Sequence, residues 1–146
     1  MTTMKKYSVS AKGLKGFVIE TISGNHKVVV DQPQMMGGED EGPSPVDFIL
    51  IAWVSCLATV AKIIARQEQI DLKNIEVMAE GELDLDVLRG MNMDDRSGFE
   101  KVDINIKLDA DLTQDKKKEF IKEIERRCPV TDNISNKTSF KINLVD

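Results

Sequence analysis

The sequence has few of the residues that build metal and cofactor sites. Two cysteines and one histidine occur among 146 residues. Neither a CxxC nor an HxxxH spacing is present, so a four-ligand zinc site would need carboxylates to complete it. The glycine patterns that bind nucleotide phosphates, GxGxxG and the P-loop, are absent as well. We therefore expect no bound metal and no cofactor.

An excess of positive charge and a leader segment are also lacking. The 20 lysines and arginines are outnumbered by 25 acidic residues, and the net charge of −5 disfavours nucleic acid as a partner. The first residues, "MTTMKKYSVS", are followed by no apolar stretch, so no secretory signal is predicted. We expect a cytoplasmic protein. In that reducing compartment Cys56 and Cys128 are either two inert buried thiols or a pair that cycles.

No internal repeat interrupts the chain, and its length and composition, 41% apolar and 31% charged, predict one folded domain over residues 1–146. Residues 7–31 are typical of strands. The runs "GFVIETI" and "HKVVVD" are rich in β-branched residues, and Ser23-Gly24-Asn25 between them indicates a hairpin turn.

The most apolar segment is "GPSPVDFILIAWVSCLATVAKIIA", residues 42–65, and Cys56 lies inside it. Ser44, Pro45 and Asp47 predict the start of a helix that runs to about Gln69. The apolar residues cover its whole circumference. Because the uninterrupted run is shorter than the about 20 residues of a membrane span, we predict a buried core helix and no membrane association. A single sheet shields only one face of a helix, so we also predict an obligate homodimer in which two such helices lie against each other.

The rest of the chain alternates between strand and helix patterns. Residues 74–84 and 99–110 are predicted strands, and residues 114–127 a helix capped by Thr113. Pro129 either ends that helix or opens another, with Cys128 near its N-terminus. Residues 138–145 are predicted as a closing strand, with Phe140, Ile142 and Leu144 on one face. The fold class expected is α+β, with antiparallel sheets around a long buried central helix.

Three segments together resemble the OsmC/Ohr family: "DQPQMMGGEDEGPSPVDFILIAWVSCLATV", "FEKVDINIKLDADLT" and "IERRCPVTDNI". The resemblance covers nearly the whole chain. It implies an intertwined homodimer with two central helices enclosed by two sheets. It also implies a two-cysteine peroxidase that acts on organic or fatty-acid hydroperoxides, with Cys56 as the peroxidatic thiol, Cys128 as the resolving thiol and an external dithiol as reductant. An apolar wall of Ile49, Ala52, Trp53 and Val60 suits an alkyl hydroperoxide.

One part of the family pattern is missing. An apolar environment raises the pKa of a cysteine, so a reactive thiolate needs a nearby cation or hydrogen-bond donor. The peroxidases that the chain resembles use an arginine held by a glutamate ten positions before the reactive cysteine, where this chain has Val46. The nearest acid is Asp47, and no arginine precedes Cys56. The pattern is similar to a less characterised branch of the family. The candidate cations are Lys12, Lys15, Arg89, Arg96, Arg126 and Arg127.

Two other functions are consistent with the sequence. The same dimer could be a binding protein for a small apolar or thiol-bearing ligand, with Met35 and Met36 at an adaptable entrance. Alternatively, Cys56 could serve a hydrolase or transferase, which requires His26 within hydrogen-bond reach of the thiol.

Overall fold

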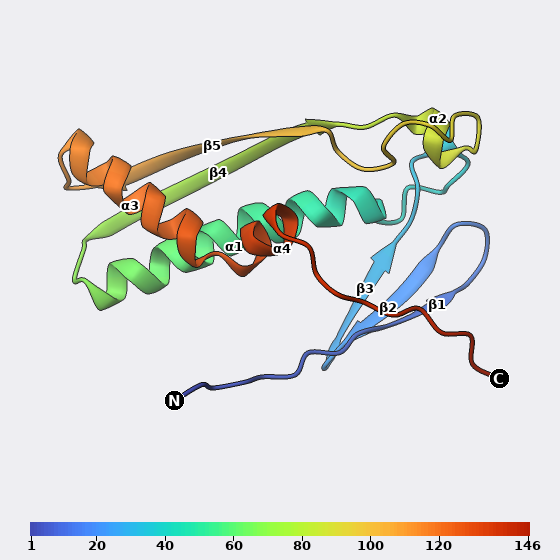
Figure 1. The fold of residues 1–146 in the computed structure, drawn as a ribbon, viewed down its shortest axis with the longest axis horizontal. Coiled ribbons are helices and arrows are strands. Elements are labelled where there is room, and N and C mark those ends of the chain that lie inside the picture. Colours follow the sequence, from blue (N-terminus) through green and yellow to red (C-terminus); the bar gives the residue numbers. More distant parts are fainter. The chain divides into compact units, whose positions relative to one another are not determined.

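The computed structural model describes residues 1–146 and has an α+β fold with two antiparallel sheets (Figure 1). This confirms the predicted fold class. The chain forms two compact units, Met1–Ile49 and Leu50–Asp146, which are described separately below. The single domain expected from the sequence stays a prediction. In chain order the elements are β1 (Ser10–Gly13), β2 (Ile19–Ser23), β3 (His26–Val30), the 3-10 helix η1 (Gln34–Met36), α1 (Pro45–Gln67), β4 (Leu72–Glu82), α2 (Leu85–Leu88), β5 (Lys101–Ala110), α3 (Gln114–Arg127) and α4 (Pro129–Ser135).

The first unit contains the three-stranded sheet β1-β2-β3. The predicted hairpin turn forms: Ser23 pairs with His26, and Gly24 between them has a φ of 58°, which glycine adopts without steric cost. His26 is exposed at the start of β3. The strand pattern of residues 7–31 is therefore realised as two short hairpins.

The loop after β3 is organised by the buried carboxylate of Asp31, which is 1% exposed. Its oxygens accept hydrogen bonds from the backbone N–H groups of Gln32 at 2.7 Å, Glu39 at 3.0 Å and Glu41 at 3.1 Å. These N–H groups, that of Glu41 above all, lower the pKa of Asp31. A side chain at Gly38 would place its Cβ 1.9 Å from the Gln32 carbonyl oxygen, so the loop can close around Asp31 only with glycine there.

Helix α1 begins as the sequence predicts. The Asp47 carboxylate accepts hydrogen bonds from the Ser44 N–H at 2.9 Å and the Ser44 hydroxyl at 2.6 Å, while Ser44 Oγ accepts from the Asp47 N–H at 3.2 Å. The helix ends at Gln67, two residues before the predicted Gln69. Gln69 takes a left-handed φ of 56°, and the Ile70 N–H bonds back to the Ala65 carbonyl, which closes the helix end.

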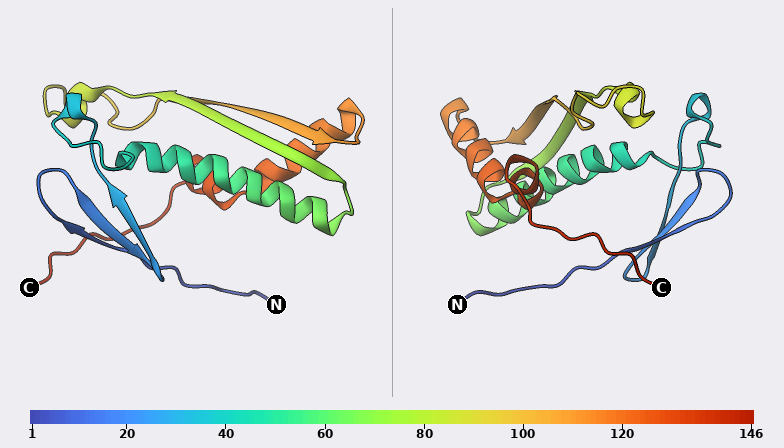
Figure 2. Two further views of the ribbon diagram at one scale, coloured as in Figure 1. Left: turned by 180° about the vertical axis from the view of Figure 1, so that it is seen from behind. Right: turned by 45° about the vertical axis from the view of Figure 1, so that its right-hand side comes forward.

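The core of the second unit lies where α1 packs against the β4–β5 hairpin and α3 (Figures 1 and 2). The even-numbered residues of β5 face this core, as the alternation predicts, and the odd-numbered residues up to Asp109 are exposed. The fully buried side chains of this core include Ile64 and Ile124. The cluster as a whole consists of Leu57, Val60, Ala61, Ile64, Ala65, Phe120, Ile124 and Cys128.

A single chain does not enclose α1. The buried residues Leu57, Val60, Ala61, Ile64 and Ala65 form one face of the helix. Other apolar residues remain partly exposed: Ile49 (46%), Ile51 (42%) and Ile63 (44%). The predicted all-round burial therefore does not arise within one chain.

By length and composition alone, α1 could cross a membrane, because its most apolar window has a mean hydropathy of 2.2. The core helix of a soluble protein meets the same criteria. The strands that cover α1 carry exposed charges on their outer face, such as Glu76, Glu80 and Lys107. Charges and a two-stranded sheet with open edges are not tolerated in hydrocarbon. The packing therefore favours a core helix.

The predicted closing strand is wrong. Residues 136–146 form no helix or strand, and Phe140, Ile142 and Leu144 are exposed by 78%, 89% and 97%. A strand is stabilised by the hydrogen-bond ladder to a neighbour, and no strand of the chain pairs with this segment. Its alternation alone cannot provide that ladder.

Replacing Asp31 by Asn should lower the melting temperature by several degrees at neutral pH, because the amide NH₂ group is a donor and leaves at least one of the three N–H groups without an acceptor. The folded-state pKa is depressed, so this stabilisation is present above the unfolded-state pKa of about 4 and is lost as pH falls through the folded-state value. Thermal melts from pH 7 to pH 2 should show the wild type converging on the variant. The control is Asp111→Asn at an exposed position. A constant difference across this range would contradict the role of Asp31.

Candidate thiol site

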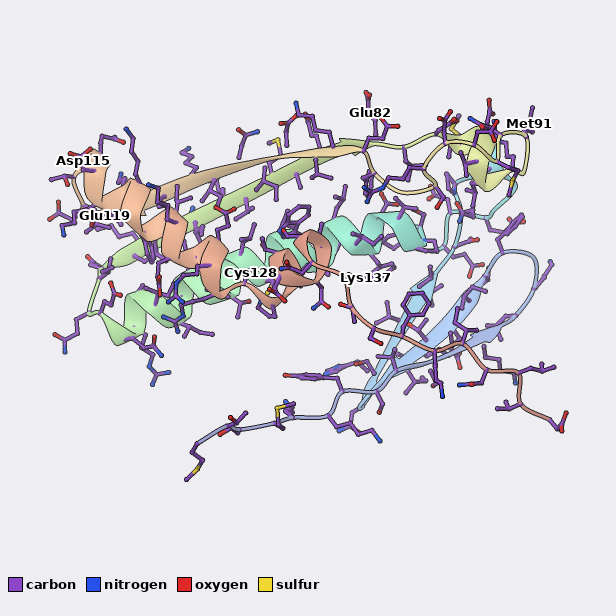
Figure 3. The ribbon with its side chains drawn as sticks, viewed as in Figure 1. Glu82, Met91, Asp115, Glu119, Cys128 and Lys137 are labelled. Carbon is purple, nitrogen blue, oxygen red and sulfur yellow. The ribbon has the colours of Figure 1, made fainter.

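The structure brings the two cysteines together. Cys56 lies on α1 and is partly buried, whereas Cys128 is 1% exposed at the corner between α3 and α4, beside α1 (Figure 3). Both are free thiols, Cys56 packs against the cluster that contains Cys128, and each thiol shifts the pKa of the other. Two residues far apart in the sequence thus form one dithiol.

The backbone around Cys128 explains its position. Cys128 is in an extended conformation, its N–H donates to the Glu125 carbonyl at 3.3 Å, and Pro129 occupies the first position of α4. Of the two alternatives left open by the sequence, the structure shows that α3 ends and Pro129 opens a new helix. Cys128 is its N-cap: the Thr131 N–H donates to Cys128 Sγ at 3.4 Å.

The two thiols have opposite pKa shifts. Burial raises the pKa of Cys56, an effect that the Val130 N–H partly offsets and that the neighbouring Cys128 sulfur reinforces. Burial also acts to raise the pKa of Cys128, but hydrogen bonds from the Thr131 hydroxyl and N–H, the Cys56 thiol and the Val130 N–H outweigh it, so that its pKa is lowered. The contacts around the pair therefore favour negative charge on the Cys128 sulfur over the Cys56 sulfur.

A small apolar hollow of about 280 Å³ adjoins the dithiol. Trp53, one helical turn before Cys56, lines it and donates its indole N–H to Thr131 Oγ1 at 2.8 Å. The hollow thus shares Trp53 and Thr131 with the surroundings of the thiols. Its other walls are Leu57, Val102, Ile104, Ile106, Ile121 and Glu125.

Of the four residues expected to form the substrate wall, one lines the hollow within a single chain. Trp53 lines the hollow, Val60 belongs to the buried core, and Ile49 and Ala52 are exposed. Ile104 and Ile106 also line the hollow but were not predicted. The alternation of β5 could have identified them, because it places both residues on the face toward α1. Thr131 had no such signal.

The candidate charged partners are engaged elsewhere. Asp47 caps α1. Arg127 donates to the Gln67 side chain at 2.9 Å and lies 3.9 Å from the Glu123 carboxylate, which also binds Arg126. Arg89 lies 3.6 Å from Asp86. Arg96 is exposed in the loop before β5, and Lys12 and Lys15 are exposed in the first unit. None of the candidate cations within the second unit contributes to the pKa shift of either thiol.

A larger hollow lies at the far end of the β4–β5 hairpin but contains no nucleophile. It has a volume of about 690 Å³, and its walls are mostly carboxylates, among them Glu80, Glu82, Glu100 and Asp103. An apolar substrate would gain little from such walls. The thiol site is therefore the stronger candidate, although its hollow is smaller. No group of three or more His, Cys, Asp or Glu side chains is arranged to hold a metal ion.

The family model for OsmC-like proteins matches residues 38–143 of this sequence. The chain belongs to this family. A relative named hydroperoxide reductase, from Mycoplasma genitalium, is 24% identical over 142 residues, which are 96% of this chain and 94% of the relative.

Solved structures share the fold of this OsmC-like chain. The OsmC-like protein of Mycoplasma pneumoniae aligns with a TM-score of 0.79 and 19% identity, covering 91% of this chain and 89% of that one. An organic hydroperoxide resistance protein OsmC from Legionella pneumophila aligns with a TM-score of 0.65 and 19% identity, covering 91% of each chain. These likenesses support the fold of the whole chain.

Because the two thiols are neighbours in the fold, oxidation of the folded protein with diamide should close a Cys56–Cys128 disulfide within one chain. The intact mass should decrease by two hydrogen atoms, and peptide mapping should identify the linked pair. The Cys56→Ser variant has one thiol and cannot form this disulfide, so its mass should not decrease by two hydrogen atoms. Disulfides between chains, or two free thiols after treatment, would contradict the observed arrangement.

Proposed function

We propose that this protein is a thiol-dependent reductase of organic hydroperoxides, with Cys56 as the peroxidatic thiol and Cys128 as the resolving thiol. The observation that carries this proposal is the contact between two free thiols beside an apolar hollow. Relatives named hydroperoxide reductase and organic hydroperoxide resistance protein support it. Two cysteines with only a packing role would require neither the adjoining hollow nor the hydrogen bonds that lower the pKa of Cys128.

The difference in exposure between the sulfurs suits their proposed roles. Cys56 is partly accessible and can meet the substrate, whereas Cys128 is covered and needs only to reach Cys56. Cys56 sulfur attacks the terminal peroxide oxygen, the O–O bond breaks, and an alcohol leaves, so that Cys56 becomes a sulfenic acid. Cys128 then attacks the Cys56 sulfur and releases water as the disulfide forms. An external dithiol reduces this disulfide and restores both thiols.

The hollow favours a substrate with an apolar tail. Val102, Ile104 and Ile106 on β5 face Leu57 and Trp53 on α1, and Glu125 is the one charged residue among the walls. Burying a hydrocarbon chain against such walls contributes roughly 0.8 kcal/mol per CH₂ group. We therefore propose alkyl hydroperoxides rather than hydrogen peroxide as the preferred substrates.

We also propose that the protein is a homodimer, formed through the exposed face of α1. Along this face lie the small residues Ala52, Ser55 and Thr59 with Ile51 and Ile63 beside them. The Ser55 and Thr59 hydroxyls donate to carbonyls of the same helix, at 2.6 Å and 2.8 Å, so they need no solvent. A second copy of the helix is an occupant that could cover this face without leaving polar groups unpaired.

A binding protein for a small apolar or thiol-bearing ligand is the second candidate. No lysine or arginine of the second unit lowers the pKa of Cys56, which favours this candidate, because an unactivated thiol is a poor nucleophile. Unchanged ligand affinity after alkylation of both cysteines would support binding over catalysis. The hydrolase alternative gains no support, since His26 is an exposed residue of the first unit.

Cys56→Ser should abolish the consumption of an alkyl hydroperoxide, because a hydroxyl is not nucleophilic enough to cleave the O–O bond. Cys128→Ser should still react once per chain and then stop, with Cys56 trapped as sulfenic acid. Peroxide consumption with a dithiol reductant, together with intact mass after one equivalent, measures both effects. The proposed function is wrong if Cys56→Ser consumes the hydroperoxide as fast as the wild type does, or if both wild-type thiols remain free after one equivalent of hydroperoxide.

Ile63→Glu should disrupt the dimer, because it places a charge on the apolar face through which we expect the helices to meet. Within one chain Ile63 is 44% exposed, so the cost to monomer folding should be small, about 1 kcal/mol or less. Sedimentation velocity should show a dimer for the wild type and for the control Met78→Glu, and a monomer for Ile63→Glu. A folded wild-type monomer at micromolar concentration would rule out the dimer.

A further inference from the structure

The proposed reaction leaves open which group takes the proton of Cys56. No lysine or arginine of the second unit acts on this thiol, and Asp47 is committed to the helix cap. The side chain that contacts Cys56 and can accept a proton is Cys128. Among the residues that make Cys128 a better proton acceptor, Thr131 contributes two polar groups.

Thr131 is oriented by the indole of Trp53. An indole N–H can only donate, so the 2.8 Å bond from Trp53 Nε1 makes Thr131 Oγ1 an acceptor there and leaves the hydroxyl hydrogen for another partner. The Thr131 hydroxyl lowers the pKa of Cys128, and the Thr131 N–H donates to Cys128 Sγ at 3.4 Å. Both polar groups of Thr131 thus favour negative charge on the same sulfur.

We infer that Thr131, held in place by Trp53, is a positioning residue that keeps Cys128 Sγ as the hydrogen-bond acceptor of the Cys56 thiol, so that Cys128 takes the Cys56 proton during attack on the hydroperoxide. This inference rests on the proposed function. It assigns to the second sulfur the task that a cation performs in the peroxidases that the chain resembles.

The charged groups around the dithiol do not provide another route. On α3, Glu125 lines the hollow with Trp53 and Thr131, while Arg126 and Arg127 are directed to Glu123 and Gln67. On α4, Asp132 accepts hydrogen bonds from Asn136. The β5 residues that line the hollow are apolar, and the α1 cations Lys62 and Arg66 are exposed. Neutral donors, with Thr131 foremost, therefore determine which sulfur carries the negative charge.

The reaction balances with the dithiol carrying one proton. Cys56 sulfur bonds to the terminal oxygen of the hydroperoxide, the O–O bond breaks, and the Cys56 proton moves to Cys128 sulfur. Cys128 passes this proton to the alkoxide that leaves, which gives the alcohol and returns Cys128 to the thiolate. That thiolate attacks the Cys56 sulfenic acid, the S–S bond forms, and the hydroxide released takes a proton from solvent. The hydroperoxide is the oxidant, and the external dithiol later supplies the two electrons.

The test is a titration of reduced protein without peroxide, followed by thiolate absorbance in the ultraviolet. In a Cys56→Ser background Cys128 is the sole thiol. Adding Thr131→Val should move its ionisation upward by about one pH unit, because the hydroxyl donor is lost while the side-chain shape is kept. Thr131→Ser, which retains the hydroxyl, should titrate like the parent. A parental midpoint for Thr131→Val, or an equal shift for both variants, would overturn the inference.

Trp53→Phe provides a second variant that keeps Thr131 itself. Loss of the indole N–H frees the hydroxyl to rotate, so the Cys128 midpoint should rise in the same direction but less. If Thr131→Val fails to fold, an unchanged midpoint in Trp53→Phe overturns the inference on its own. The single variant Cys128→Ser keeps Cys56 as its one thiol. The ionisation midpoint of this thiol should lie above the lower of the two midpoints of the wild-type dithiol. A midpoint below that value would contradict a base role for Cys128.

The kinetic counterpart separates this inference from the proposed function. With an alkyl hydroperoxide, Thr131→Val should lower kcat about tenfold at neutral pH, keep KM, and recover toward the wild type at alkaline pH as the dithiol ionises without help. If Thr131→Val lowered kcat only by disturbing the fold, kcat would not recover at alkaline pH. If the wild type consumes no hydroperoxide, the proposed function fails, and the titration still decides whether Thr131 holds the charge on Cys128.

Discussion

The packing of one face of α1 is the constraint on which the rest of the structure depends. Leu57, Ala61 and Ile64 are buried against the β4–β5 hairpin and α3, and this contact fixes the helix in rotation as well as position. Cys56 lies at the edge of that face. The chain turn between α3 and α4 brings Cys128 to the same edge, so core packing and dithiol geometry have one cause.

The sequence predicted those features that local pattern determines. The capping residues Ser44 and Asp47, the alternation of β5 and the helix after Thr113 all appear in the structure because each depends on neighbours within a few residues. The pairing of Cys56 with Cys128 followed from family resemblance rather than from any local pattern. The start of a new helix at Pro129 was one of two alternatives that local sequence could not separate.

The failures have a common physical origin. The apolar residues of α1 surround its axis, so their pattern does not indicate which face meets β5, and it did not identify Leu57 as a wall of the hollow. The segment 138–145 has the alternation of a strand but no partner in its own chain. Thr131 was overlooked because its contacts with Trp53 and Cys128 exist only after α1 and α4 have packed. Each failure concerns a contact between elements.

Trp53 is the sole tryptophan of the chain, and its ring nitrogen is bonded to the residue that contacts Cys128. Any rearrangement of the sulfurs that shifts α4 must change the surroundings of this indole. The protein therefore contains its own optical reporter: intrinsic fluorescence can follow the interconversion of dithiol and disulfide in real time, without a label and without altering either cysteine.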